Sequence, residues 1–149
     1  MRIVQLSDTA VVGAPVVAKF SDLAVQVPDA WARVFADASL STESSSYAEA
    51  SFELPGGVYH EVVGCVRAVG GLQIPRGFAA AVVPAGRYAH VQFAGAEENI
   101  ADGFRDIYDW AAENGIELGG RKLDVGYRRD GGASVHDLYI DVVEVSGQA

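Results

Sequence analysis

Alternating apolar and polar residues predict strands along much of this chain. In the second half, residues 78–83 and 87–93 alternate on either side of Pro84-Ala85-Gly86, which predicts a hairpin. Two further strands are predicted at 121–129 and 136–145. The first half is less regular, and its strands are predicted at 2–6, 10–20, 47–54 and 59–69.

Apolar residues three to four positions apart predict two helices. In the second helix, Glu97 and Glu98 suit the positively polarised start, and Gly115 suits the left-handed end. The apolar face between them consists of Ile100, Phe104, Ile107, Tyr108 and Ala111. In the first half, Pro28 predicts the start of a helix that runs to about Leu40, before a polar loop at 39–46. Helices separated by antiparallel hairpins predict an α+β fold, with both helices on one face of the sheet.

Three pairs of similar segments occur in the same order, which indicates a duplicated unit. Residues 29–38 resemble 102–111, and 16–20 resemble 89–93, both at an offset of 73 residues. Residues 60–69 resemble 136–145 at an offset of 76. Each unit then has the order strand, helix, strand, strand. Residues 1–149 are therefore predicted to form a single domain with repeat units at about 1–74 and 75–149. Chance similarity between strands and amphipathic helices is the alternative.

Composition limits the class of partner and the compartment. Eleven Lys and Arg against twenty Asp and Glu give a net charge of −9, and no basic run occurs. Such a surface repels phosphate backbones, so we expect no direct nucleic-acid binding. The single Cys65 cannot form an internal disulfide, and no apolar run reaches membrane-spanning length. The sequence therefore predicts a cytoplasmic protein with no membrane partner.

No motif in the sequence predicts a metal, a cofactor or covalent catalysis. The three histidines, His60, His90 and His136, lack the His-x₃-His spacing of zinc sites, and no pair of cysteines exists. Neither a Gly-x-Ser-x-Gly motif nor a Walker loop is present. We therefore expect no metal and no cofactor.

The order of motifs in the second half resembles a known family. Its pattern consists of Pro84-x-Gly86-x-Tyr88, a helix with Trp110, the segment from Gly115 to Leu118, and the strands LDVGY (123–127) and LYIDV (138–142). This pattern is similar to the GyrI-like small-molecule-binding domain, the effector-binding domain of AraC-type and MerR-type transcription activators. The resemblance implies a duplicated βαββ architecture with a ligand cleft between the halves. Because no helix-turn-helix or basic region precedes the domain, we expect a stand-alone member.

The resemblance also indicates ligand-binding residues. Tyr88, Asp124, Asp137 and Tyr139 match positions in the family pattern, and in the family the acid corresponding to Asp124 lies in the ligand pocket. The repeat aligns Glu61 with Asp137, so a pseudo-twofold axis brings an acid from each unit toward the central seam. We predict that these five residues border one cavity. The alternative is that the acids are solvated residues of edge strands.

Tyr127 departs from the family pattern. In the family, a Tyr closely follows the acid of the penultimate strand, whereas here Val125 and Gly126 separate Asp124 from Tyr127. Strand alternation then predicts that Tyr127 faces away from Asp124.

Acids beside aromatic residues favour one function over two alternatives. An unpaired carboxylate is costly to bury and gains from a cation, which aromatic faces also attract. We therefore expect the cleft to bind a small organic molecule of cationic or lipophilic character, for effector sensing or for drug or toxin sequestration. The first alternative is a hydrolase of reactive electrophiles, with Asp124 or Asp137 as general base. The second is a protein-interaction module resembling a DNA gyrase inhibitor; a protein partner or a homodimer also fits the sequence.

Overall fold

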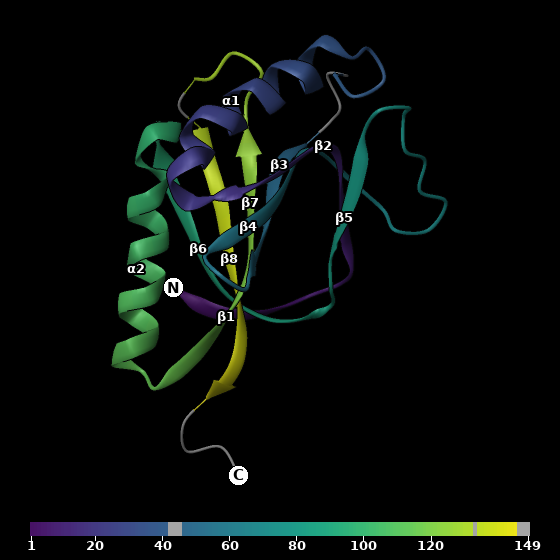
Figure 1. Cartoon of the computed structure of the whole chain (residues 1–149). Coiled ribbons are helices and arrows are strands. Elements are labelled where there is room, and N and C mark those ends of the chain that lie inside the picture. Colours follow the sequence, from purple (N-terminus) through teal and green to yellow (C-terminus); the bar gives the residue numbers. More distant parts are fainter. Residues whose placement is uncertain (42–45, 133, 146–149) are drawn as a thin grey trace.

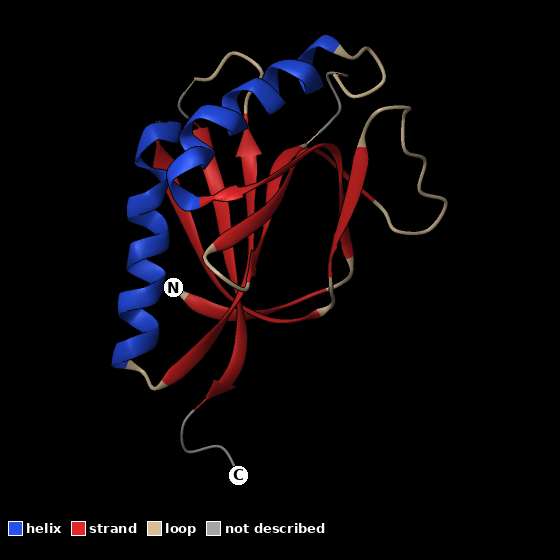
Figure 2. Ribbon diagram, in the orientation of Figure 1, coloured by secondary structure: helices blue, strands red, loops and turns tan. Residues whose placement is uncertain are grey.

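One antiparallel sheet carries both helices on the same face (Figures 1 and 2). The computed structural model describes residues 1–41, 46–132 and 134–145; part of the predicted polar loop, residues 42–45, lies outside them. Within these ranges, the helices are α1 (Phe20–Ala36) and α2 (Ile100–Glu113), and a short 3₁₀ turn, η1 (Glu97–Asn99), precedes α2. The strands are β1 (Arg2–Leu6), β2 (Thr9–Lys19), β3 (Tyr47–Leu54), β4 (Val58–Arg67), β5 (Ala79–Val83), β6 (Gly86–Gly95), β7 (Ile116–Tyr127) and β8 (Ser134–Val145).

The strand order confirms the predicted α+β architecture. The sheet runs β1-β6-β8-β7-β3-β4-β2-β5, so the units β2-α1-β3-β4 and β6-α2-β7-β8 meet where β3 pairs with β7. No helix in the described part of the chain is both long and apolar enough to cross a membrane.

The predicted hairpin of residues 78–83 and 87–93 is wrong. Strand β5 pairs with β2, and strand β6 pairs with β1 and β8. The two edge strands of the sheet, β1 and β5, therefore each pair with a strand from the other half of the chain. Only Pro84 and Ala85 lie between the observed strands β5 and β6. A two-residue hairpin loop needs positive φ angles, which Pro84 cannot adopt and Ala85 rarely adopts. The backbone N–H of Ala85 instead donates to Oδ1 of Asp8, at 2.7 Å. This hydrogen bond joins the connection between β5 and β6 to the connection between β1 and β2.

Helix α1 begins at Phe20, eight residues before the predicted start at Pro28. Pro28 therefore lies inside the helix, where the missing N–H and the ring cost roughly 3 kcal/mol. The apolar face of α1 offsets this cost by packing on the core of β2 and β4. The residues of that face are Leu23, Val27, Ala30, Trp31 and Val34. Packing on the sheet thus outweighs the local preference of proline for a helix start.

Candidate ligand-binding cleft

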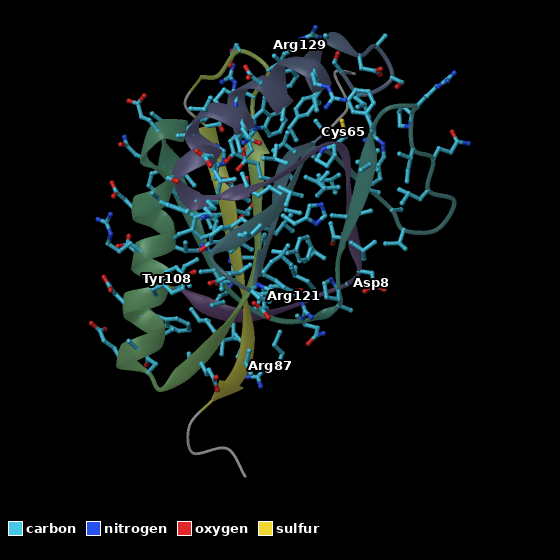
Figure 3. All side chains as sticks on the ribbon, in the orientation of Figure 1. Asp8, Cys65, Arg87, Tyr108, Arg121 and Arg129 are labelled. Atoms are coloured by element: carbon cyan, nitrogen blue, oxygen red, sulfur yellow. The ribbon has the colours of Figure 1, made fainter. Side chains whose placement is uncertain are left out.

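A cleft lies between the two helices, above the central seam of the sheet. It has two neighbouring parts with cavity volumes of about 420 and 920 Å³, and Leu23, Glu49, Glu61 and Ala101 line both. We call the whole space the interhelix cleft. Figure 3 shows Tyr108, which lines the smaller part, and Arg129, which lines the larger part, far apart on the molecule. Volumes of this size are typical of small-molecule sites.

Glu49 lies at the floor of the interhelix cleft, on the central strand β3. The Nε1–H of Trp31 donates to its Oε1 at 2.7 Å. Burial, the largest cause, and the negative charge of Glu61 together raise the pKa of Glu49 to about 8, although side-chain hydrogen bonds with Trp31 and Tyr127 act in the opposite direction. At neutral pH, Glu49 therefore holds a proton that a bound cation would displace.

Glu61 lies close to Glu49, on β4 and directly opposite Ser51 of β3. Burial raises its pKa, whereas a hydrogen bond from Ser51 and the positive charge of Lys122 lower it. Two carboxyl groups with raised pKa values thus face one apolar and aromatic space. This arrangement favours positively charged or hydrogen-bond-donating groups in the cleft.

Asp124 is held by two donors beneath the cleft and is only 3% exposed. The hydroxyl of Tyr127 donates to its Oδ2 at 2.6 Å, and Nδ1–H of His136 donates to its Oδ1 at 2.7 Å. His136 is fully buried, and its Nε2 has no hydrogen-bond partner among the described residues. Because protein groups already satisfy both oxygens of Asp124, its carboxylate is less available to a ligand than that of Glu49.

Tyr127 faces the same side of the sheet as Asp124, which corrects the prediction from alternation. Tyr47 pairs with Tyr127, whereas Ala48 pairs with Val125, so the register skips Gly126 and the strand forms a β-bulge there. The φ angle of Gly126 is +136°, a conformation that favours glycine. The bulge absorbs the extra residue and returns the Tyr127 ring to the cleft, where it lies 4.9 Å from the ring of Trp31.

The structure does not bring the five predicted residues into one cavity. Glu61 and Asp124 line the interhelix cleft. Leu138 pairs with Asp124, so Asp137 and Tyr139 point to the opposite face of the sheet. There, Asp137 accepts a hydrogen bond from His90 at 2.8 Å, and Tyr139 stacks on the His90 ring. Ligand binding by any of these residues remains a prediction.

Tyr88 also lies on the face without helices. Its side chain is 1% exposed, and its hydroxyl donates to the carbonyl oxygen of Pro84 at 2.6 Å. It packs in a cluster with Val11, Val62 and Leu123, against which Tyr139 also packs. These contacts are those of a core residue.

The predicted equivalence of Glu61 and Asp137 is off by one residue. Glu49 pairs with Val63 in the first unit, and Asp124 pairs with Leu138 in the second. Adding 75 to each residue number of the first pair gives the second pair, so the repeat offset of these strands is 75 residues. At this offset His136, and not Asp137, corresponds to Glu61. A one-residue slip exchanges the two faces of a strand, which explains why Asp137 was predicted on the wrong side.

Sequence reasoning missed Glu49, Trp31 and Tyr127 as cleft residues. A signal for Glu49 was present, since an acid stands between small residues of a strand whose other positions are largely buried. At the offset of 75 residues, Glu49 is also the repeat counterpart of Asp124. Within the described ranges, no three His, Cys, Asp or Glu side chains are arranged to hold a metal ion.

Several solved structures share this fold at low sequence identity. The integron cassette protein VCH_CASS2 from Vibrio cholerae superposes with a TM-score of 0.66 at 13% identity, over 95% of each chain. SAV2435 bound to tetraphenylphosphonium has a TM-score of 0.70 at 8% identity, over 95% of this chain and 93% of the other. The EcmrR C-terminal domain has a TM-score of 0.62 at 14% identity, over 97% of each chain.

A family model gives evidence that does not depend on these superpositions. No curated protein matches this chain in sequence. The model of the integron-associated effector binding proteins, Cass2, matches residues 2–142, which include both helices and nearly all of the sheet. The chain therefore belongs to the Cass2 family of integron-associated effector binding proteins, and its predicted resemblance to GyrI-like effector-binding domains is confirmed.

Proposed function

We propose that the interhelix cleft binds a lipophilic organic cation, with Glu49 as its principal counter-charge. The observation that carries this proposal is the raised pKa of Glu49, about 8, on the floor of a cleft that also contains Trp31 and Tyr127. A cation restores the stability of the ionised carboxylate, and the aromatic rings add cation–π attraction. The effector-binding family and the tetraphenylphosphonium complex of SAV2435 support the proposal.

Binding of a cation should depend on pH through Glu49. Because Glu49 has a pKa of about 8, only about a tenth of it is ionised at pH 7, so affinity should rise about tenfold between pH 7 and pH 9. Titration calorimetry with tetraphenylphosphonium should show this rise, together with the release of nearly one proton per cation at pH 7. Triphenylphosphine oxide, a neutral compound of similar shape, should bind without either effect.

Two variants separate Glu49 from a general effect of charge. At pH 9, Glu49→Gln should weaken tetraphenylphosphonium binding about ten- to a hundredfold, since a charge-assisted contact is lost. Glu117→Gln removes the same charge from an exposed position of β7 and should have little effect. Equal affinities for Glu49→Gln and the wild type, with no dependence on pH, would contradict the proposal.

The same pKa also keeps the hydrolase alternative open. A carboxyl group that titrates near pH 8 can exchange a proton with a reacting molecule at physiological pH. Incubation with styrene oxide, followed by product analysis, tests this alternative. Formation of the diol by the wild type, and its loss in Glu49→Gln, would replace the binding function with an enzymatic one. Absence of diol above the uncatalysed rate would leave binding as the function.

We further propose that the protein acts in the cytoplasm as a sensor or a sequestering protein that accepts several lipophilic cations. The volume of the cleft and its two neighbouring parts support a site that tolerates ligands of different shapes. A series of lipophilic cations of increasing size, titrated under identical conditions, tests this tolerance. If only one cation of the series binds, the proposed tolerance is contradicted.

A further inference from the structure

The smaller part of the interhelix cleft already contains a positive charge. The Nζ of Lys122 lies 5.4 Å from the centre of the Phe104 ring and 5.3 Å from the centre of the Tyr108 ring. Phe104 and Tyr108 lie one turn apart on α2, and Lys122 reaches them from β7. These distances are those of a cation–π contact with both rings.

The other basic side chains that line the cleft bind elsewhere. Arg105 pairs with Asp102 at 3.3 Å, and Arg128 pairs with Asp130 at 2.8 Å. Arg129 donates to the carbonyl oxygen of Phe35 at 3.1 Å. Lys122 forms no ion pair within 4.0 Å among the described residues, although its charge lowers the pKa of Glu61. Its ammonium group therefore lies on the aromatic rings without a fixed anionic partner.

We propose that Lys122 determines specificity as a tethered cation that occupies the aromatic end of the cleft. This inference rests on the proposed function. A purely cationic ligand that extends into the smaller part of the cleft must displace the ammonium group from Phe104 and Tyr108, which lowers its affinity. A lipophilic cation that also carries a carboxylate can place its positive group near Glu49 and its anion near Lys122. Among lipophilic cations, those that also carry a carboxylate therefore fit the cleft best.

Two related probes test this specificity. Tetraphenylphosphonium is a plain lipophilic cation, and (4-carboxybutyl)triphenylphosphonium carries a carboxylate on a similar body. Replacing Lys122 by Met should raise affinity for the first probe about three- to thirtyfold, which corresponds to the loss of one competing cation–π contact. The same substitution should weaken the second probe. An unchanged ratio between the two affinities would overturn the proposal.

The control variants separate the position of the charge from the net charge. Lys19 is the other lysine of the chain, is exposed and does not line the cleft. Lys19→Met gives the same net charge as Lys122→Met and should leave the ratio unchanged. Lys122→Arg keeps a cation over the rings and should also leave the ratio near that of the wild type. A change of the same size in Lys19→Met would overturn the role of Lys122.

A measurement without ligand distinguishes failure of this inference from failure of the proposed function. Lysine-selective ¹³C labelling gives side-chain signals from two residues only. Ring currents should shift the Lys122 ε-methylene protons upfield, and Tyr108→Leu and Phe104→Leu should each reduce that shift. If no upfield shift is present, the inference is overturned, whatever the probes do. If the shift is present and neither probe binds any variant, the occupied aromatic end is supported and the proposed function is overturned.

Discussion

At the scale of single residues, Glu49 shows how burial and charge conflict in this protein. A carboxylate on the floor of an aromatic cleft has lost most of its water, and the nearby Glu61 adds a like charge. The side-chain hydrogen bonds with Trp31 and Tyr127 do not compensate for this. The side chain therefore stays protonated at neutral pH, and ionised Glu49 destabilises the native state. The same property makes it a strong counter-charge for a cation.

Stability should reveal this conflict as a dependence on pH. The unfolded chain releases the Glu49 proton near pH 4.5, whereas the native state holds it until about pH 8. The native state thus binds more protons in this range, and its stability falls as the pH rises from about 4.5 to about 8. Replacing Glu49 by Gln should remove this loss and stabilise the protein at pH 9 by roughly a few kcal/mol.

Urea unfolding between pH 4 and pH 9 measures this difference. The two proteins should have similar stability below about pH 4.5, because Glu49 is then protonated in both states. Glu117→Gln, at an exposed position, is the matched control. If the free energy of unfolding depends on pH in the same way for Glu49→Gln and the wild type, ionising this buried carboxyl group does not destabilise the native state, and the prediction is wrong.

At the scale of elements, one extra residue in β7 decides which face Tyr127 occupies. The bulge at Gly126 lets two residues of β7 occupy the space of one, so Asp124 and Tyr127 point to the same side. A β-carbon at Gly126 would collide with the carbonyl oxygen of Val135, on the neighbouring strand. The position therefore requires glycine for both its φ angle and its close approach to β8.

Deletion of Gly126 should be tolerated better than its replacement. Without this residue, Tyr127 follows Val125 directly, and regular alternation places its ring on the Asp124 face. Gly126→Ala should instead destabilise the protein by about 1–3 kcal/mol, because the bulge cannot hold a side chain. Thermal unfolding of both variants checks the ranking, with Gly70→Ala as a control at an open position. A deletion more harmful than the alanine substitution would mean that the bulge itself is required.

At the scale of the whole molecule, the two units are joined by exchange of their edge strands. Strand β1 of the first half pairs with β6 of the second half, and β5 of the second half pairs with β2 of the first, so neither half completes its sheet alone. The seam between β3 and β7 then lies at the centre of the sheet, below the cleft between the two helices. The cleft is consequently a property of the complete sheet, with β3, β4 and β7 each contributing side chains to it.

The net charge leads to a prediction about DNA. With a charge of −9 and no basic run, the chain lacks the counterion-release contribution that drives such binding. Fluorescence anisotropy with labelled duplex DNA at about 50 mM salt should show no submicromolar binding. A salt-sensitive complex of submicromolar affinity would overturn this prediction, since it would require a local basic surface that outweighs the net charge.

The sequence alone determined most of the elements and the fold class. Alternation located most strands, helical spacing located α2, and Gly115 marked its end with a φ of +65°. These signals are local, since each depends on residues within a few positions of one another. The repeat of strand, helix, strand and strand then gave the α+β class, because that order with short connections favours an antiparallel sheet.

Only the tertiary structure decided strand partners and faces, and with them the site. Strand β5 and strand β6 are adjacent in sequence, yet each pairs with a distant strand. A bulge at Gly126 and a one-residue error in the repeat offset each moved side chains to the other face, since alternation has a period of two. Glu49 became prominent only when β3 was placed beside β7, on the floor of the cleft between two helices, because its raised pKa arises from surroundings that are remote in sequence.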